Sequence, residues 1–262
     1  MNIGASTSNF YPLPPEESLA ILLQAGFRTV EVFFNTLSEL ELPFVRKLRH
    51  RIEAAGATVA AVHPFSSFIE PFFLFGTYSR RLTDGFALYE RTFEAAAEIG
   101  APYVVIHGDR PEGVLTPEQS VERFGQLCDL GASVGVYPAQ ENVVNFRSQD
   151  QNYLRLMREM LGEKARFVLD VKQAFRCGVS AESVIEAMGK GIVHVHISDH
   201  TEEYDCLPPG QGNTDYAELL KCLQQNGYNG TLMLELYRRN FKDVQDLLNS
   251  AQLLEDLLPE KT

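Results

Sequence analysis

The alternation of apolar and polar positions divides the chain into short strand-like runs and longer helix-like segments that follow one another from end to end. In "TVEVFF", residues 29–34, Val30 and Val32 lie on one side and Glu31 on the other, which is the period of two of a β-strand. Segments such as "DGFALYERTFEAAAEIG", residues 84–100, are amphipathic, and several open on Pro, Ser, Thr or Asp and end at Gly. The pattern therefore predicts repeated strand–helix units.

Eight runs are predicted to be strands: residues 2–6, 29–34, 57–63, 103–108, 135–143, 165–171, 192–198 and 231–236. Eight strand–helix units in 262 residues match the (β/α)8 TIM barrel, whose typical length is about 250 residues. A doubly wound open sheet is the main competitor, but it often carries a Gly-rich phosphate turn, and neither GxGxxG nor GxxxxGK[ST] occurs here. We expect a single barrel domain over residues 1–262, with the active site at the C-terminal ends of the strands.

Ionisable side chains of the kinds that bind metal ions close six successive predicted strands. In chain order they are His63, His107, Glu141, Asp170, His196 and Glu235. Each alone fits a strand-end residue that reaches solvent or caps the following helix. Because strand ends of a barrel converge on one mouth, the repeated placement predicts a common site.

The stretch "HVHISDH", residues 194–200, holds three of the six histidines. With a period of two, His194 and His196 point to one side of a strand, while the apolar residues 193, 195 and 197 point to the other. We expect His196 to be a nitrogen ligand. His194 lies one layer lower and is expected to be packed or to contact a ligand residue.

Glu141, Asp170, His196 and Glu235 together offer three carboxylates and one imidazole. Such a mixed set suits Mn, Mg, Co or Zn without choosing between them. The sequence therefore predicts one divalent metal ion as cofactor, held by these four residues.

The composition disfavours several classes of partner and location. The formal net charge of −12 disfavours nucleic acid and anionic membrane surfaces, both of which attract clustered Lys and Arg. The four cysteines lack CxxC spacing, and neither a secretory signal nor an apolar run of about eighteen residues is present. We expect a cytoplasmic protein with reduced thiols.

Four segments resemble the xylose-isomerase-like barrels, a family that includes sugar isomerases and epimerases and the endonuclease IV type of abasic-site nuclease. They are "ENV" at 141–143, "LDV" at 169–171, "HVHISD" at 194–199 and the closing run "PPGQGNTDYAELLKCLQQNGYNGTLMLEL" at 208–236. The resemblance covers nearly the whole chain. It implies the same four metal ligands, with Glu141 and Glu235 flanking a bound sugar as the catalytic pair.

The chain departs from the pattern of this family at two positions. Gln173 stands where many members have a histidine, and Cys206 stands where the endonucleases have another histidine ligand. The resemblance also places His63 and His107 where the endonucleases bind a further zinc. With the acidic charge, the two departures count against DNA repair.

The leading hypothesis is a metal-dependent isomerase or epimerase of a small carbohydrate or derivative, working by proton transfer through a metal-stabilised enediolate. Hydrolysis of a phosphoester in the manner of endonuclease IV is the enzymatic alternative. A barrel that binds a sugar without turnover is the alternative from a different class.

Six residues are expected to bind substrate or to contact the metal ligands: Glu31, His63, His107, Lys172, Gln173 and Arg238. The alternative for Glu31 is a salt bridge across the barrel floor, and the alternative for Lys172 is an exposed loop position. Arg238 is one of four arginines that follow strand ends, together with Arg110, Arg147 and Arg176. Any of the four could bind an anionic group of a substrate.

The segment 64–78 follows the third predicted strand and is rich in aromatic residues. Long ordered loops in compact domains are often functional, and an apolar lid here would exclude water from the site. A subunit contact is the alternative, since exposed aromatic clusters often mark interfaces. The oligomeric state is thus left open between a monomer and a homo-oligomer.

Overall fold

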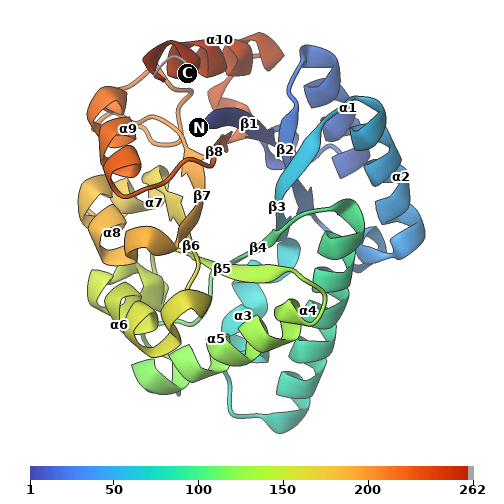
Figure 1. Ribbon diagram of the computed structural model, residues 1–262, viewed down its shortest axis with the longest axis vertical. Helices are drawn as coiled ribbons and strands as arrows, with labels where there is room; N and C mark the ends of the chain where they lie inside the picture. Colours follow the sequence, from blue (N-terminus) through green and yellow to red (C-terminus); the bar gives the residue numbers. More distant parts are fainter. Residues whose placement is uncertain (259–262) are drawn as a thin grey trace.

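The computed structural model describes residues 1–258, and within them eight parallel strands close into one barrel in sequential order. The strands are β1 (Asn2–Ser6), β2 (Thr29–Phe34), β3 (Thr58–Pro64), β4 (Tyr103–Ile106), β5 (Tyr137–Glu141), β6 (Phe167–Asp170), β7 (Ile192–Ile197) and β8 (Thr231–Leu234). Figure 1 shows the helices as an outer ring around these strands. The predicted (β/α)8 barrel is confirmed.

The helices are α1 (Pro15–Ala25), α2 (Leu42–Ala54), α3 (Glu70–Phe73), α4 (Ser79–Ile99), α5 (Pro117–Ala132), α6 (Gln151–Leu161), α7 (Val171–Arg176), α8 (Ala181–Met188), α9 (Tyr216–Gln225) and α10 (Val244–Leu257). Capping residues in the sequence explain where several of these helices begin. Thr116 and Gln119 form a reciprocal capping box at α5, and Asp215 accepts a backbone hydrogen bond at the start of α9. The short helices α3 and α7 lie in the loops after β3 and β6.

Apolar side chains form two separate cores. The larger core fills the space between the strands and the outer helices, and the smaller lies inside the barrel, where it consists of Ala61, Val105, Ala139 and Val168. Val193 packs against the inner core, contrary to the expected alternation along β7. The reason is a register shift, because Phe167 pairs with Ile192 whereas Val168 pairs with His194, which leaves residue 193 without a partner on β6.

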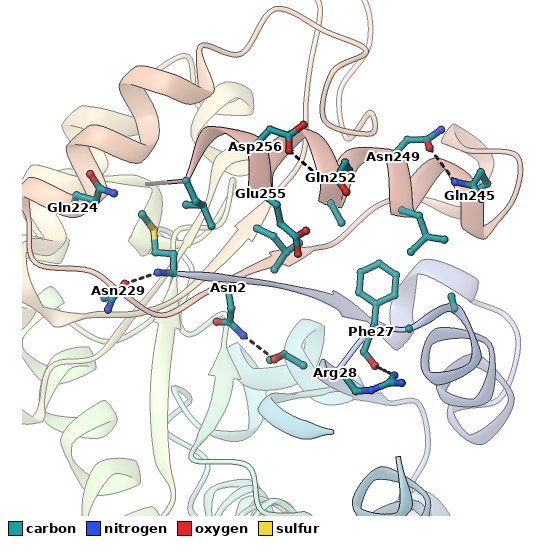
Figure 2. A pocket seen from close by; sticks show the side chains of 18 residues that line it. Asn2, Phe27, Arg28, Gln224, Asn229, Gln245, Asn249, Gln252, Glu255 and Asp256 are labelled. Carbon is teal, nitrogen blue, oxygen red and sulfur yellow. Dashed lines mark hydrogen bonds between the residues drawn. The ribbon is translucent and has the colours of Figure 1, made fainter. Parts of the chain in front are cut away.

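A large cavity lies at the N-terminal ends of the strands, at the face opposite the strand-end site. Its volume is about 1460 Å³, and its lining comes from the starts of β1 and β2 and from α10. Figure 2 shows amide side chains around it, with Gln245 bonded to Asn249 and Gln252 bonded to Asp256 along α10. None of the predicted site residues lines this cavity among residues 1–258. In TIM barrels this face is associated with stability rather than catalysis.

The loop after β3 packs tightly on α4 because Gly85 has no side chain. A Cβ atom at Gly85 would lie 2.5 Å from the backbone oxygen of Phe73, whereas a Cβ at the helical Gly125 would meet only Leu161 Cδ2 at 3.2 Å. We expect Gly85→Ala to destabilise the protein by about 1–3 kcal/mol through overpacking. Gly125→Ala, the matched control, should be neutral or stabilising because alanine favours a helix. Urea unfolding measures both, and equal stability of the two variants would contradict the close packing.

None of the helices within residues 1–258 has the length and apolar character needed to cross a membrane. The expected domain extent of 1–262 includes residues 259–262, which lie outside the described part of the chain.

Candidate functional site

Four of the predicted residues meet at the C-terminal mouth of the barrel. Glu141 and Asp170 are the last residues of β5 and β6, His196 is next to last in β7, and Glu235 directly follows β8. One ligand atom from each lies within 4.8 Å of the ligand atoms of the other three. Strand ends that are far apart in the sequence thus converge on one point, as the barrel topology requires.

The four side chains present their polar atoms to a shared space. His196 Nδ1 lies 3.4 Å from both Glu141 Oε1 and Glu235 Oε2, and 3.9 Å from Asp170 Oδ2. Glu141 Oε2 and Asp170 Oδ2 are buried and have no hydrogen-bond partner among residues 1–258. His107 Nε2 and Lys172 Nζ approach these two oxygens to 2.9 Å and 3.1 Å, but neither contact has hydrogen-bond geometry. Buried carboxylate oxygens with free lone pairs fit a divalent cation.

Lys172 is buried between two of the carboxylates. Its Nζ lies 3.1 Å from Asp170 Oδ2 and 3.0 Å from Glu235 Oε2, and its side chain is 7% exposed. The alternative of an exposed loop lysine is therefore wrong. The reason is local, since Lys172 lies in α7, whose first turn begins directly at Asp170 and directs the lysine back over the barrel mouth.

His63 and His107 form a second group with Glu141. His107 Nε2 lies 2.9 Å from Glu141 Oε2 and 3.3 Å from His63 Nε2, and His63 Nε2 lies 3.8 Å from the same carboxylate oxygen. Phe33 stacks on the His63 ring at a centroid distance of 4.7 Å. Both histidines thus contact a predicted metal ligand, and these three residues also qualify as a group that could hold an ion.

Glu31 is fully buried inside the barrel and accepts hydrogen bonds from two histidines of β7. Its Oε2 lies 3.0 Å from His194 Nε2 and 2.9 Å from His196 Nε2. Glu31 thus contacts His196, one of the four predicted ligands, and the same contacts pair it with two histidines across the barrel, so the structure does not separate the two expectations for Glu31. His194 likewise contacts the site through Glu31, as expected for the lower layer.

The carboxylates of the site differ in pKa because each has different charged neighbours. Burial alone would raise the pKa of Glu141, but the charge of His107, together with the contacts of His196 and His63, holds it well below its usual range. Burial would also raise the pKa of Glu31, but the charge of His196 outweighs this effect and lowers the pKa well below its usual range. These two carboxylates are therefore ionised at neutral pH.

Asp170 differs from its neighbours. Burial raises its pKa to about 7, with the charge of Lys172 opposing this rise and repulsion from Glu141 and Glu235 adding to it. Burial would lower the pKa of His196, but the charges of Glu235 and Glu31 raise it well above its usual range. Asp170 is therefore the carboxyl of this cluster whose ionisation is least favoured in the absence of an ion.

Three uncharged residues that sequence reasoning did not single out fix the strand ends. Asn142 bonds both the N–H and the carbonyl of Asp170, at 2.8 and 3.0 Å. Asn9 donates to Leu234 O and accepts from Leu236 N, and so holds the backbone on both sides of Glu235. Gln140 donates to the carbonyl oxygens of residues 106, 107 and 141. Asn142 could have been suspected from its place after Glu141, whereas Asn9 gives no comparable signal.

Gln173 and Arg238 make local contacts. The backbone N–H of Gln173 caps α7 by donating to Asp170 Oδ1 at 3.1 Å, and its side-chain oxygen accepts from Val144 N at 3.3 Å. The guanidinium of Arg238 donates to the carbonyl oxygens of Phe241 and Lys242. Gln173 therefore touches a predicted metal ligand, while Arg238 reaches the site only as part of a cavity wall.

Of the four rim arginines, two are neutralised by aspartates. Arg147 pairs with Asp109 at 2.9 Å, and Arg176 pairs with Asp205 and also donates to Tyr237. These ion pairs reduce the number of cations available for an anionic substrate group.

A cavity of about 610 Å³ opens beside Glu235 and Lys172. Aromatic residues from β2 and from three loops line it: Tyr11, Phe33, Phe65, Phe68 and Tyr237. The aromatic residues of the segment 64–78 therefore do not share one environment. Phe65 and Phe68 face this cavity, whereas Phe75 belongs to the outer core and Phe72 is exposed.

Glu70 anchors this segment from within. It is fully buried and accepts hydrogen bonds from the Tyr89 hydroxyl and from Gly108 N. These contacts connect α3 with α4 and with the end of β4, so the loop after β3 has a fixed position beside the cavity. The sequence did not distinguish Glu70 from a surface glutamate.

Comparisons with known proteins agree with this architecture. The family described as "Xylose isomerase-like TIM barrel" matches residues 19–257. An uncharacterised protein of Methanocaldococcus jannaschii is 25% identical, over 98% of this chain and 89% of the relative. The 3-dehydroshikimate dehydratase of Pseudomonas aeruginosa is 24% identical over 94% of this chain, which spans only 40% of that enzyme.

Two solved structures show the same fold. A D-tagatose 3-epimerase-like protein superposes with a TM-score of 0.82 at 19% identity, covering 98% of this chain and 97% of the other. D-psicose 3-epimerase, solved in the presence of D-fructose, gives a TM-score of 0.80 at 15% identity, with 98% and 99% covered.

Proposed function

The chain belongs to the xylose isomerase-like TIM barrel family, and from this premise we propose that it is a divalent-metal-dependent isomerase or epimerase of a small sugar or sugar derivative. One observation carries the proposal. The ligand atoms of four strand-end residues lie within 4.8 Å of one another, and two of their buried carboxylate oxygens have no hydrogen-bond partner within residues 1–258. The epimerase names among the structural neighbours support the choice of substrate class.

Glu141, Asp170, His196 and Glu235 would hold the ion. A bound divalent cation supplies Lewis-acid polarisation of a substrate carbonyl, which acidifies the neighbouring C–H group. The remaining work falls to side chains of the protein. A cavity of about 610 Å³ lies within the size range of small-molecule sites and leads directly to Glu235.

Glu141 and Glu235 are the residues proposed to accept and return the proton. The Glu235 carboxylate lines the cavity, and burial would raise its pKa, but the charges of Lys172 and His196 lower it, so that it is ionised and able to accept a proton. Glu141 lies deeper, where His107 and His196 hold it in the ionised form. Lys172 keeps the Glu235 carboxylate in place at 3.0 Å. The aromatic wall limits the access of water to the reacting carbon.

The hydrolase alternative receives less support. Cys206, which replaces a histidine ligand of the endonucleases, is buried, and burial raises the pKa of its thiol to about 12. Cys206 also belongs to none of the groups of side chains within residues 1–258 whose ligand atoms lie close enough together to share an ion. The net charge of −12 also opposes binding of a phosphate backbone.

Exchange of substrate C–H protons with solvent tests the proposal. The protein is treated with chelator, reloaded with Mn²⁺ and incubated in D₂O with a panel of ketoses and hydroxy-aldehydes, while ¹H NMR follows the carbons next to the carbonyl. We expect exchange that requires Mn²⁺ and is accompanied by an epimer or isomer of the substrate. Loss of water from the exchanging substrate would instead indicate a dehydratase, in line with the Pseudomonas aeruginosa relative.

Binding measurements beside the exchange assay distinguish the two alternatives. Sugar binding without metal and without exchange would favour the non-catalytic barrel. Salt-sensitive binding of duplex DNA, with no exchange from any sugar, would favour the hydrolase.

A further inference from the structure

The two ring nitrogens of His196 face different partners. Nδ1 faces the three carboxylates of the proposed ion site, at 3.4 Å from Glu141 and Glu235 and 3.9 Å from Asp170. Nε2 faces the opposite direction and lies 2.9 Å from Glu31 Oε2. A neutral imidazole carries one proton and one free lone pair, so the partner of one nitrogen decides what the other can do.

Glu31 reaches His196 across the interior of the barrel. It lies on β2, whereas His196 lies on β7, and β1 and β8 separate these strands in the closed sheet. The same oxygen of Glu31 also accepts from His194 Nε2 at 3.0 Å. All three side chains are at most 1% exposed. Two hydrogen bonds from adjacent layers of one strand therefore fix the position of the carboxylate.

We propose that Glu31 is a positioning residue. When an ion takes the place of the Nδ1 proton of His196, Glu31 keeps the remaining proton on Nε2, so that the Nδ1 lone pair is directed at the ion held by Glu141, Asp170 and Glu235. His194 supports this arrangement by holding Glu31 in place. The inference rests on the proposed metal site and adds to it a residue that does not touch the ion. Such a carboxylate behind a ligand histidine orients the ring and makes it a stronger ligand.

Glu31→Gln removes the charge while keeping the shape. Glu31 Oε1 has no hydrogen-bond partner within residues 1–258, so the amide NH₂ can take its place while the amide oxygen still faces both histidines. Titration of the chelated protein with Co²⁺, followed by its visible absorption, is expected to show an affinity at least about ten-fold weaker than wild type and an altered spectrum. Glu70→Gln is the matched control, because Glu70 is equally buried but its hydrogen bonds within residues 1–258 go to Tyr89 and Gly108 rather than to a predicted ion ligand. Its Co²⁺ affinity should equal that of wild type.

A second measurement on the wild type does not depend on how the variant folds. In the Zn²⁺-loaded protein, ¹⁵N NMR of the histidine rings should show His196 protonated at Nε2 and without a proton at Nδ1. Co²⁺ affinity of Glu31→Gln within two-fold of wild type would overturn the inference while leaving the proposed function intact. A proton on Nδ1 in the Zn²⁺-loaded protein would overturn the inference and would also remove His196 from the proposed ion ligands. A wild type that binds no Co²⁺ would overturn the metal site itself, and this inference with it.

Discussion

Replacing Glu235 by Gln is expected to lower the rate of Mn²⁺-dependent substrate proton exchange by about three orders of magnitude. The amide has the size of the carboxylate but cannot accept a proton at neutral pH, and a general base typically contributes about 10²–10⁴-fold. Glu235 also lines the 610 Å³ cavity and is one of the four proposed ion ligands. The rate is measured at saturating Mn²⁺, so that weaker ion binding does not account for the loss.

Glu218→Gln is the matched control for this substitution. Glu218 lies on α9, pairs with Lys221 at 2.9 Å and is remote from the strand-end residues. Its variant should exchange protons at the wild-type rate. A Glu235→Gln enzyme that retains more than a tenth of the wild-type rate, with Mn²⁺ bound, would remove Glu235 from the proposed catalytic pair.

Replacing Lys172 by Met is expected to destabilise the metal-free protein by about 3 kcal/mol, as measured by urea unfolding. The ammonium group lies 3.1 Å from Asp170 and 3.0 Å from Glu235, and removing it leaves two buried carboxylates without their cation. Breaking a buried pair is costly because the remaining charge cannot be solvated. In excess Mn²⁺ the difference from wild type should shrink, since a divalent ion would compensate the same carboxylates.

Lys221→Met provides the comparison for this variant. Lys221 pairs with Glu218 on the surface, where both side chains are about half exposed and such pairs contribute little. Its loss should change the free energy of unfolding by less than about 0.5 kcal/mol, with or without Mn²⁺. A Lys172→Met variant that is equally destabilised in both conditions would show that the ion does not share the environment of Asp170 and Glu235.

The fold could be predicted from the sequence because each strand carries its own local pattern. All eight predicted runs became strands of the barrel, from β1 at Asn2–Ser6 to β8 at Thr231–Leu234, within the described residues. Strand ends were placed less accurately, since "GVYPAQENV" was expected over 135–143 and the strand covers Tyr137–Glu141. The inward position of Val193 could not be predicted, because the register shift depends on how β6 meets β7.

The candidate site was predictable to the extent that it depends on strand ends. Parallel strands of a barrel place their C-terminal residues together, so Glu141, Asp170 and Glu235 could be grouped without a structure. Contacts across the interior of the barrel could not be predicted in this way. Glu31 and His194 are 163 positions apart, and their hydrogen bond exists only because the sheet closes.

Loop conformation accounts for the other differences. Lys172 is buried because α7 begins directly at Asp170, and no sequence pattern distinguished this from an exposed loop. The aromatic residues of 64–78 were expected to act together, but Phe75 points into the outer core while Phe68 lines the cavity. When neighbouring residues of one loop lie in different surroundings, the composition of the loop does not predict which of them line the site.

Metal analysis of the protein tests the central claim most directly. The protein is purified without chelator, beside Glu235→Gln by the same protocol, and both are subjected to elemental analysis. The account predicts about one equivalent of Mn, Co, Zn or Mg in the wild type and less in the variant, because Glu235 supplies one of four ligand groups within 4.8 Å. Two or more equivalents of zinc would favour a nuclease-like site. A wild type without metal, which also binds neither Mn²⁺ nor Co²⁺ when these are added, would contradict the account.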